Sequence, residues 1–413
     1  MSERWEQMGA ETGSAQLNPF RPGMGLEPPY LADRQIQLQR FARFLDGFPS
    51  FPRNVRITGL RGVGKTVLLQ NYATVAIEHG WVVVRRELAP QLQDESAFGL
   101  AFVDDCRIAV EQGSHQAAAR RQARSTLRQA LDLLGGLSVS LAGVSISLRT
   151  PSAAQSRQPL LEDQLFAAVE TTCNAAKSLG RRGVLISYDE AHVVSDSPRL
   201  GRHPISALLS AVARAQRQGV PVMLVVCGLP PLTENLARAK SYSERMFQAE
   251  VLDALQPPED LQAFVRPLHE AHRQFEATLP DAVRLDARGY PFHIQFYGAL
   301  LWDSVPWPEP ITRSYFDSLR PALLAALDHA FFDARLARCA AFEKRVLNAI
   351  AAYGETAEFS AVVHDLQTNH DLVKNGVSRL IAKGLVFRPE RGRLAFSVPM
   401  FGDYLRRKGT SDG

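Results

Sequence analysis

The residues best suited to chemistry form a glycine-rich loop that ends in a lysine and a threonine. The run GLRGVGKT, from Gly59 to Thr66, has the spacing G-x-x-x-x-G-K-T, with a β-prone stretch before it and an apolar helical pattern after it. Glycines let backbone N–H groups turn inward around phosphates, and the following helix N-terminus adds partial positive charge. We therefore predict a nucleotide-phosphate loop. The residues expected to contact the nucleotide are Gly59, Arg61, Gly62, Val63, Gly64, Lys65, Thr66 and Val67.

Two side chains of this loop have separate expected roles. Lys65 is long enough to reach the β- and γ-phosphates and to stabilise charge during their transfer, so it is also a predicted catalytic residue. The Thr66 hydroxyl is placed to ligate Mg²⁺. ATP and Mg²⁺ are therefore the expected cofactors. The alternative, a glycine-rich turn with a chance lysine, leaves the flanking strand and helix patterns unexplained.

An acidic pair closes a second β-prone run. Residues 184–188 are mostly apolar, and Asp189 and Glu190 follow them. A phosphate-loop enzyme needs a carboxylate at a strand end for the Mg²⁺ shell, and we assign this role to Asp189. Glu190 points to the opposite side of the strand, where it can polarise the attacking water as a general base. The alternative is a solvated strand end without chemistry.

The same stretch, SYDEAHV, contains the letters DEAH, which name a helicase box. A helicase of that kind needs a second domain of alternating strands and helices with its own arginine motif. The chain after residue 256 instead shows helical patterns and one short hairpin pattern. The tetrapeptide therefore does not by itself indicate a helicase. His192 could face the γ-phosphate or a DNA partner, but the sequence assigns it no role.

The remaining core pattern predicts an α/β fold. Apolar helical stretches separate β-prone runs, as parallel βαβ units require. A long insertion, 89–157, contains the segment 136–149, in which apolar residues alternate with serines on either side of an Ala-Gly pair. This alternation predicts a β-hairpin that could touch DNA, touch a neighbouring subunit or pack on the core. The expected strands are 54–58, 81–88, 183–188, 220–227 and 249–254.

Length and composition favour a soluble protein of about two or three domains. The chain has 413 residues, of which 46% are apolar and 22% charged. It lacks an apolar run of about 18 residues and a signal-peptide pattern at the start, so we expect neither a membrane span nor secretion. The four cysteines are far apart in the sequence, which fits a reducing cytoplasm and gives no zinc or disulfide pattern.

The C-terminal part of the chain is basic. From residue 335 onward there are 13 Lys and Arg against 8 Asp and Glu, whereas the rest of the chain has 34 against 35. Three helical patterns and a hairpin follow one another, as in a winged helix-turn-helix, whose third helix enters the major groove of duplex DNA. The alternative is a winged helix that contacts protein or serves as a rigid cap. The predicted DNA contacts are Lys374, Asn375, Ser378, Arg379, Arg388, Arg391 and Arg393.

This order of phosphate loop, acidic strand end, helical region and winged helix resembles the AAA+ ATPases of the origin-recognition and cell-division-control clade. It is also similar to the STAND signalling ATPases, and the resemblance covers about residues 25–408. The resemblance to the first clade implies ATP hydrolysis, DNA binding and ATP-dependent assembly. The resemblance to the STAND ATPases implies instead that the winged helix controls a protein partner. The resemblance also implies a sheet of order 5-1-4-3-2. The implied domains are a disordered tail at 1–24, the ATPase core at 25–256, a helical lid at 257–334 and the winged helix-turn-helix at 335–413.

The resemblance assigns further residues by position. Arg34 matches an adenine-side box, although Asp33 replaces its usual glycine. Cys227 lies where many members have a polar sensor at a strand end. Arg245 lies in the segment of the arginine finger, which usually acts on the next subunit and thus implies a homo-oligomer. His293, in the run GYPFH, lies where initiators have a sensor arginine; this departure is closer to the STAND relatives and leaves both nucleotide contact and simple packing open.

Overall fold

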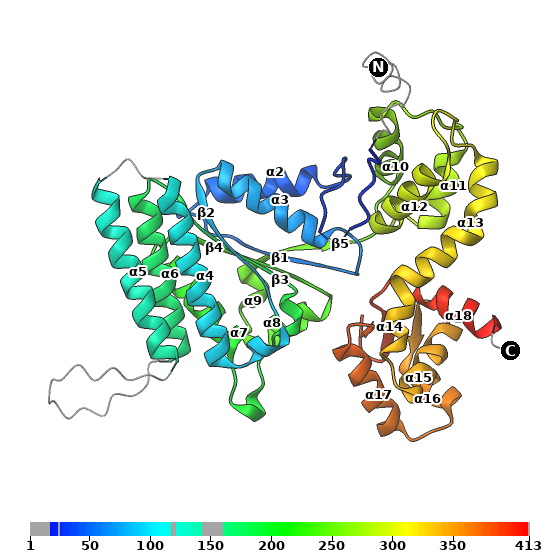
Figure 1. The fold of residues 1–413 in the computed structure, drawn as a ribbon. Coiled ribbons are helices and arrows are strands. Elements are labelled where there is room, and N and C mark those ends of the chain that lie inside the picture. The colour runs from blue at the N-terminus through cyan, green and yellow to red at the C-terminus, as the bar shows by residue number, and fades with distance from the viewer. Residues whose placement is uncertain (1–16, 24, 117–120, 143–159, 412–413) are drawn as a thin grey trace, which may run out of the picture.

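The computed structural model describes residues 17–23, 25–116, 121–142 and 160–411. Figure 1 shows a sheet with helices on both faces, then a helical region, then a C-terminal group of helices. Within these described residues, no helix is long and apolar enough to cross a membrane.

The core is a five-stranded parallel sheet with the order β2-β3-β4-β1-β5. This order confirms the predicted 5-1-4-3-2 arrangement. The central strands are almost fully buried, as expected for a parallel sheet covered on both faces. The carboxyl ends of the strands that carry the two motifs meet at one edge of the sheet. The strands are β1 (Asn54–Gly59), β2 (Trp81–Glu87), β3 (Gly183–Asp189), β4 (Val222–Gly228) and β5 (Phe247–Leu252).

Helices pack on both faces of the sheet. On one face, α2 (Gln35–Asp46) and α3 (Lys65–Glu78) form a core with the strands, in which the rings of Phe41 and Tyr72 stack at 4.0 Å. The other face is covered by a second core that includes α7. The remaining elements of this part are η1 (Pro90–Gln93), η2 (Ala191–Val193), η3 (Pro198–Leu200), α7 (Pro204–Arg217), α8 (Pro231–Ala239) and α9 (Ser243–Met246).

The insertion is helical where it is described, and the predicted hairpin is wrong in its first half. Three long helices, α4 (Glu95–Gln116), α5 (Arg121–Leu141) and α6 (Leu161–Ser178), lie side by side (Figure 1). The predicted first strand is the end of α5, and the second lies outside the described residues. Leu134, Leu137 and Leu141 also have the spacing of one helix face, and all three pack in the core that includes α4 and α6.

The predicted lid is a group of four helices. Part of the predicted disordered tail, residues 17–23, is described and packs on it: Phe20 is 4% exposed, and Asn18 Nδ2 donates to Ala299 O at 3.0 Å. An aromatic side chain at position 20 can be buried there because Gly298 leaves room for it. The lid helices are α10 (Glu259–Glu270), α11 (Leu279–Ala287), α12 (Pro291–Ser304) and α13 (Arg313–Leu327).

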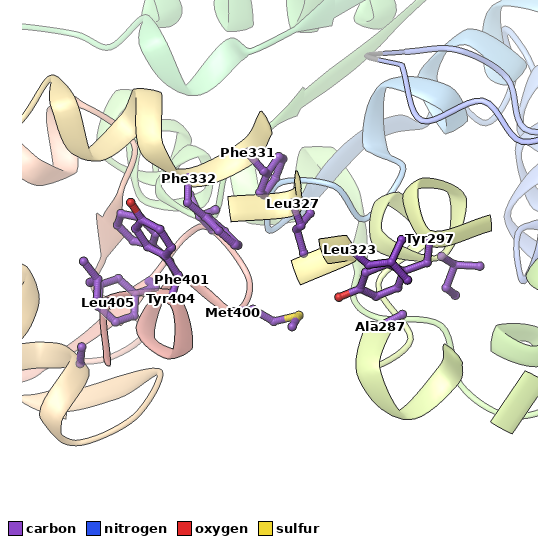
Figure 2. Close-up of a cluster of buried hydrophobic side chains, with 14 of the residues drawn as sticks. Ala287, Tyr297, Leu323, Leu327, Phe331, Phe332, Met400, Phe401, Tyr404 and Leu405 are labelled. Carbon is purple, nitrogen blue, oxygen red and sulfur yellow. The ribbon is translucent and has the colours of Figure 1, made fainter. Parts of the chain in front are cut away.

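A π-helical segment, η4 (Asp328–Asp333), and α14 (Ala334–Ala337) lead into the C-terminal domain. This domain has helices around a small antiparallel sheet of order β6-β8-β7, an arrangement compatible with the predicted winged helix. Figure 2 shows that apolar side chains of η4 and of the C-terminal domain meet in one cluster. The elements are α15 (Ala341–Ala352), β6 (Thr356–Glu358), α16 (Phe359–Leu366), α17 (His370–Ala382), β7 (Val386–Phe387), β8 (Arg393–Phe396) and α18 (Phe401–Ser411).

Candidate nucleotide site

The phosphate loop has the backbone shape that binds an anion. Gly62 and Gly64 adopt positive φ angles of 82° and 88°, and the space at the Gly64 Cβ position is open. Lys65 begins α3, so the helix N-terminus points into the loop. Its Nζ atom donates to Leu60 O at 2.8 Å, and burial lowers its pKa. The Lys65 side chain therefore folds back onto the loop backbone, and the space beside Gly64 remains open for a phosphate.

The two predicted metal ligands lie in contact. Thr66 Oγ1 donates to Asp189 Oδ2 at 2.7 Å, although the residues are 123 positions apart. The second carboxylate oxygen of Asp189 accepts from the Glu190 N–H at 2.7 Å. In proteins Mg²⁺ keeps several waters and takes one or two carboxylates together with substrate phosphates. This hydroxyl and carboxylate therefore fit the donor set of a Mg²⁺ site.

Glu190 lies at the edge of the same site with an unusual backbone. Its φ of 49° is left-handed, which is uncommon for a residue other than glycine. Burial raises the pKa of its carboxyl group, and Arg61 opposes that effect. A cavity of about 350 Å³ lies beside it, lined among others by Thr66, Asp189 and Arg85. Arg85 belongs to no sequence motif; the parallel pairing of β2 with β3, which sets Arg85 opposite Ser187, brings it to this cavity.

His192 lies between the acidic pair and the end of β4. Its Nδ1 atom is 3.4 Å from Glu190 Oε2 and accepts from the Leu229 N–H at 3.3 Å. Burial, together with Arg61 and Lys65, lowers the pKa of His192 to about 4. The imidazole is therefore neutral at neutral pH, with its proton on Nε2.

Cys227 and Arg34, which the sequence predicts to contact the nucleotide, are both buried next to the phosphate loop and the acidic pair. Cys227 is fully buried at the end of β4, and burial raises the pKa of its thiol well above its usual value. Arg34 is 4% exposed and donates through Nη2 to Val63 O at 3.1 Å. The arginine therefore contacts the phosphate loop directly.

The lid contacts the phosphate loop through Phe292 rather than through His293. The Phe292 N–H donates to Gly62 O at 3.2 Å, and its Cβ is 3.1 Å from the position that a Cβ on Gly62 would take. His293 is 1% exposed and packs among the rings of Tyr290 and Phe331. The structure thus does not bring His293 to the loop. The sequence signal for Phe292 is only its place at the start of a helix that follows a Gly-x-Pro break.

Arg245 lies at the opposite end of the sheet from the phosphate loop. It is exposed and belongs to α9, directly before β5. Phe247 pairs with Asn54 at the start of β1, whereas Leu252 pairs with Gly59 at its end. A strand rises about 3.3 Å per residue, so roughly 16 Å of β1 separates Arg245 from its own loop. Arg245 cannot reach the nucleotide of its own chain.

The predicted DNA contacts form two groups in the C-terminal domain. Four lie on the exposed face of α17, namely Lys374, Asn375, Ser378 and Arg379, and three lie around the β7–β8 turn, namely Arg388, Arg391 and Arg393. The Arg379 guanidinium is 3.0 Å from Glu343, and that of Arg393 is 2.9 Å from Glu390. Two of the cations are thus paired with carboxylates of their own domain.

The C-terminal domain also contacts the phosphate loop. The Arg61 N–H donates to Ser397 O at 3.1 Å. A Cβ on Gly384 would lie 2.8 Å from Arg61 Nη2 and 3.4 Å from Leu229 Cδ1. The sequence predicted none of these contacts, because they join segments more than 150 residues apart.

The sheet order and the glycine-rich loop together show a P-loop NTPase fold, in which one strand, β4, separates the loop strand β1 from the acidic strand β3. Similar solved structures include the Walker-type ATPase Paby2304 of Pyrococcus abyssi, with 14% identity and a TM-score of 0.49, covering 91% of this chain and 96% of that one. Another is Orc1 of Aeropyrum pernix in complex with DNA, with 16% identity and a TM-score of 0.43, covering 93% of this chain and 95% of that one. A RuvB variant of Thermotoga maritima has 15% identity and a TM-score of 0.41, covering 87% of this chain and 91% of that one.

Sequence comparison gives one family match. A family described as a domain of unknown function, DUF8462, matches residues 329–405, which run from η4 into α18. A search of curated proteins found no match.

Proposed function

We propose that the protein binds ATP with Mg²⁺, hydrolyses it, and uses the nucleotide as a switch. The observation that carries the proposal is the contact of Thr66 with Asp189 beside an open phosphate loop. When nucleotide binds, the Lys65 ammonium would turn from Leu60 O to phosphate oxygens, and Thr66 and Asp189 would hold the metal. Mg²⁺ supplies neutralisation of the phosphate charge. Glu190 accepts a proton from the attacking water.

The test compares two variants of the full chain with the wild type. Glu190→Gln is expected to keep ATP affinity and to lose about 100-fold or more in turnover, because the amide cannot accept the proton. Lys65→Ala is expected to lose ATP affinity. Glu78→Gln, an exposed position at the end of α3, is the matched control and should behave like the wild type. Wild-type protein without ATP turnover, or Glu190→Gln with full turnover, would overturn the proposal.

For the output of the switch we propose duplex DNA, bound through the C-terminal domain. The support is the basic excess after residue 335 and the exposed Arg388 and Arg391. Each arginine that contacts phosphate should contribute about 1 to the slope of log affinity against log salt. Arg388→Ala and Arg391→Ala are therefore expected to flatten this slope in anisotropy titrations of a labelled duplex with ATP. Arg199→Ala, at an exposed site of the core, is the control; binding unchanged in both arginine variants would refute the DNA contact.

The second candidate is a STAND-like signalling ATPase whose winged helix locks the site and responds to a protein partner. The contacts of Ser397 and Gly384 with Arg61 favour it. Gly384→Val would place a side chain against Leu229 and the end of the Arg61 side chain, and should weaken the contact of the domain with the loop. Gly354→Val is matched to it, because Gly354 also has a positive φ but its Cβ position is open. A rise in basal turnover in the first variant alone supports the lock; unchanged turnover supports the DNA switch.

A further inference from the structure

We propose that His192 is a positioning residue that links Glu190 to the loop after β4, where it takes the place of a polar side chain on that strand. This inference rests on the proposed ATPase function. It concerns a residue to which the sequence motifs give no role.

The first observation is the space beside Gly228, the last residue of β4. A Cβ at this position would lie 3.1 Å from both the backbone N and the Nδ1 atom of His192, and 3.3 Å from its Cβ. These contacts are tighter than ordinary van der Waals distances. The imidazole therefore occupies the volume that a side chain at the strand end would fill. Of the last two residues of the strand, Cys227 is fully buried with its thiol toward Asp189, and Gly228 has no side chain.

The second observation is that His192 is held from two sides. Its Nδ1 atom accepts from the Leu229 N–H at 3.3 Å, and its carbonyl oxygen accepts from Asn235 Nδ2 of α8 at 3.1 Å. Both partners lie after β4, whereas His192 follows β3. The imidazole thus ties the ends of two neighbouring strands together.

The third observation is the approach of Glu190. Its Oε2 atom lies 3.4 Å from the same Nδ1 atom, and its left-handed backbone fixes the direction of its side chain. Because Nδ1 already accepts from the Leu229 N–H, it has no proton to donate to Oε2, so this close approach favours a Glu190 carboxylate that is turned away from the imidazole and toward the attacking water. The position of His192 therefore biases the position of Glu190, without His192 touching the reacting atoms.

The link continues toward the C-terminal domain. Leu229 is 1% exposed, and its Cδ1 atom lies 3.4 Å from the Cβ position of Gly384. A shift of His192 moves the Leu229 amide, and the same residue packs against the domain that contacts Arg61. A movement of Glu190 at the nucleotide site can therefore reach the C-terminal domain through His192 and Leu229.

The test uses His192→Ala and His192→Asn in the full chain. Asn keeps an acceptor near the place of Nδ1, whereas Ala removes it. His192→Ala is expected to lower kcat by about 10-fold, on the order of the loss of the one neutral hydrogen bond at Nδ1, with KM for ATP unchanged. His192→Asn is expected to recover most of that loss. In hydrogen exchange, the Leu229 amide should lose protection in the Ala variant and keep it in the Asn variant.

Gly228→Ala gives an independent variant, since its Cβ presses on the imidazole and on the backbone N of His192 and leaves the chemistry of the imidazole unchanged. It should lower kcat as His192→Ala does, and the double variant should be no worse than either single one. Additive losses would overturn the proposal, as would equal turnover in wild type and His192→Ala. If the wild type itself does not hydrolyse ATP, the proposed function fails first. If the wild type hydrolyses ATP but the His192 and Gly228 variants do not show the expected losses of kcat, only the role of His192 fails.

Discussion

Asp189 and Glu190 are neighbours in the chain, yet their surroundings give them different chemistry. Both oxygens of Asp189 accept hydrogen bonds, from Thr66 and from the Glu190 backbone, which fixes the carboxylate toward the metal position. Among the described residues none donates to the Glu190 side chain, and burial raises the pKa of its carboxyl group. A carboxyl group with a raised pKa is a stronger base when ionised. Under the proposed function, one copy of the chain supplies the metal ligand and the base, whereas its Arg245 lies at the far end of the sheet.

This separation predicts complementation between two inactive variants. Glu190→Gln removes the base but keeps the arginine, and Arg245→Ala does the reverse. If Arg245 stabilises phosphoryl charge on a neighbouring subunit, a mixture should form sites that combine an intact Glu190 with an intact Arg245. We expect ATP turnover of the mixture to exceed the mean of the two variants, measured at a protein concentration where assembly occurs.

Arg199→Ala mixed with Glu190→Gln is the control for this experiment, because Arg199 is exposed on the core outside the predicted finger segment. The mixture of Arg199→Ala with Glu190→Gln should show only the ATP turnover of its Arg199→Ala copies, which keep Glu190. A mixture of the two inactive variants that stays at their mean would exclude an arginine finger in trans.

At the scale of elements, the sequence predicted what local patterns determine. The strands follow from continuous apolar runs, and the phosphate loop follows from residues within one short motif. The hairpin prediction failed because the apolar residues of 137–141 fit a period of two, while Leu134, Leu137 and Leu141 equally fit a helix face. Packing against α4 and α6 decides between the two patterns, and a local pattern does not contain that information. The same holds for Phe292, which reaches Gly62 only through the docking of the lid.

Helix α12 carries a buried histidine whose titration should be visible in stability. Burial lowers the pKa of His293 to about 4, and its Nδ1 atom has no hydrogen-bond partner in the part of the chain that the structure describes. In the unfolded chain a histidine has a pKa near 6.5, so below that pH the unfolded state binds a proton that the native state does not. The free energy of unfolding should therefore fall as the pH drops from about 6.5 to about 4, by up to about 1.4 kcal/mol per pH unit from this residue.

Denaturant unfolding across this pH range checks the prediction. His293→Leu should make the pH dependence shallower, although His192, whose pKa is lowered in the same direction, will retain a part of it. Replacement of the exposed His329 is the control and should leave the slope as in the wild type. An equal slope in wild type and His293→Leu would contradict the assignment.

At the scale of the whole molecule, the lid and the C-terminal domain share one hydrophobic core. Figure 2 shows Leu323, Leu327, Phe331 and Phe332 meeting Met400, Phe401, Tyr404 and Leu405. Ion pairs reinforce the junction: Arg288 Nη2 lies 2.6 Å from Asp403, and Arg407 Nη2 lies 2.5 Å from Asp328. The lid contacts the phosphate loop through Phe292, and the C-terminal domain contacts it through Ser397. We expect the lid and the C-terminal domain to move as one body relative to the five-stranded sheet.

Phe332 tests this inference, because it is fully buried where the two parts join. Its ring lies 5.1 Å from that of Tyr404 and 5.7 Å from that of Phe401. Phe332→Ala should cost about 3–5 kcal/mol of stability through lost burial and a cavity. In hydrogen exchange, protection should fall together in α12 and in α15, while the strands of the core keep theirs. Phe51→Ala, at a phenylalanine that is 74% exposed, should change neither. Loss of protection in α15 alone would mean that the lid folds with the core, and that the C-terminal domain moves independently of it.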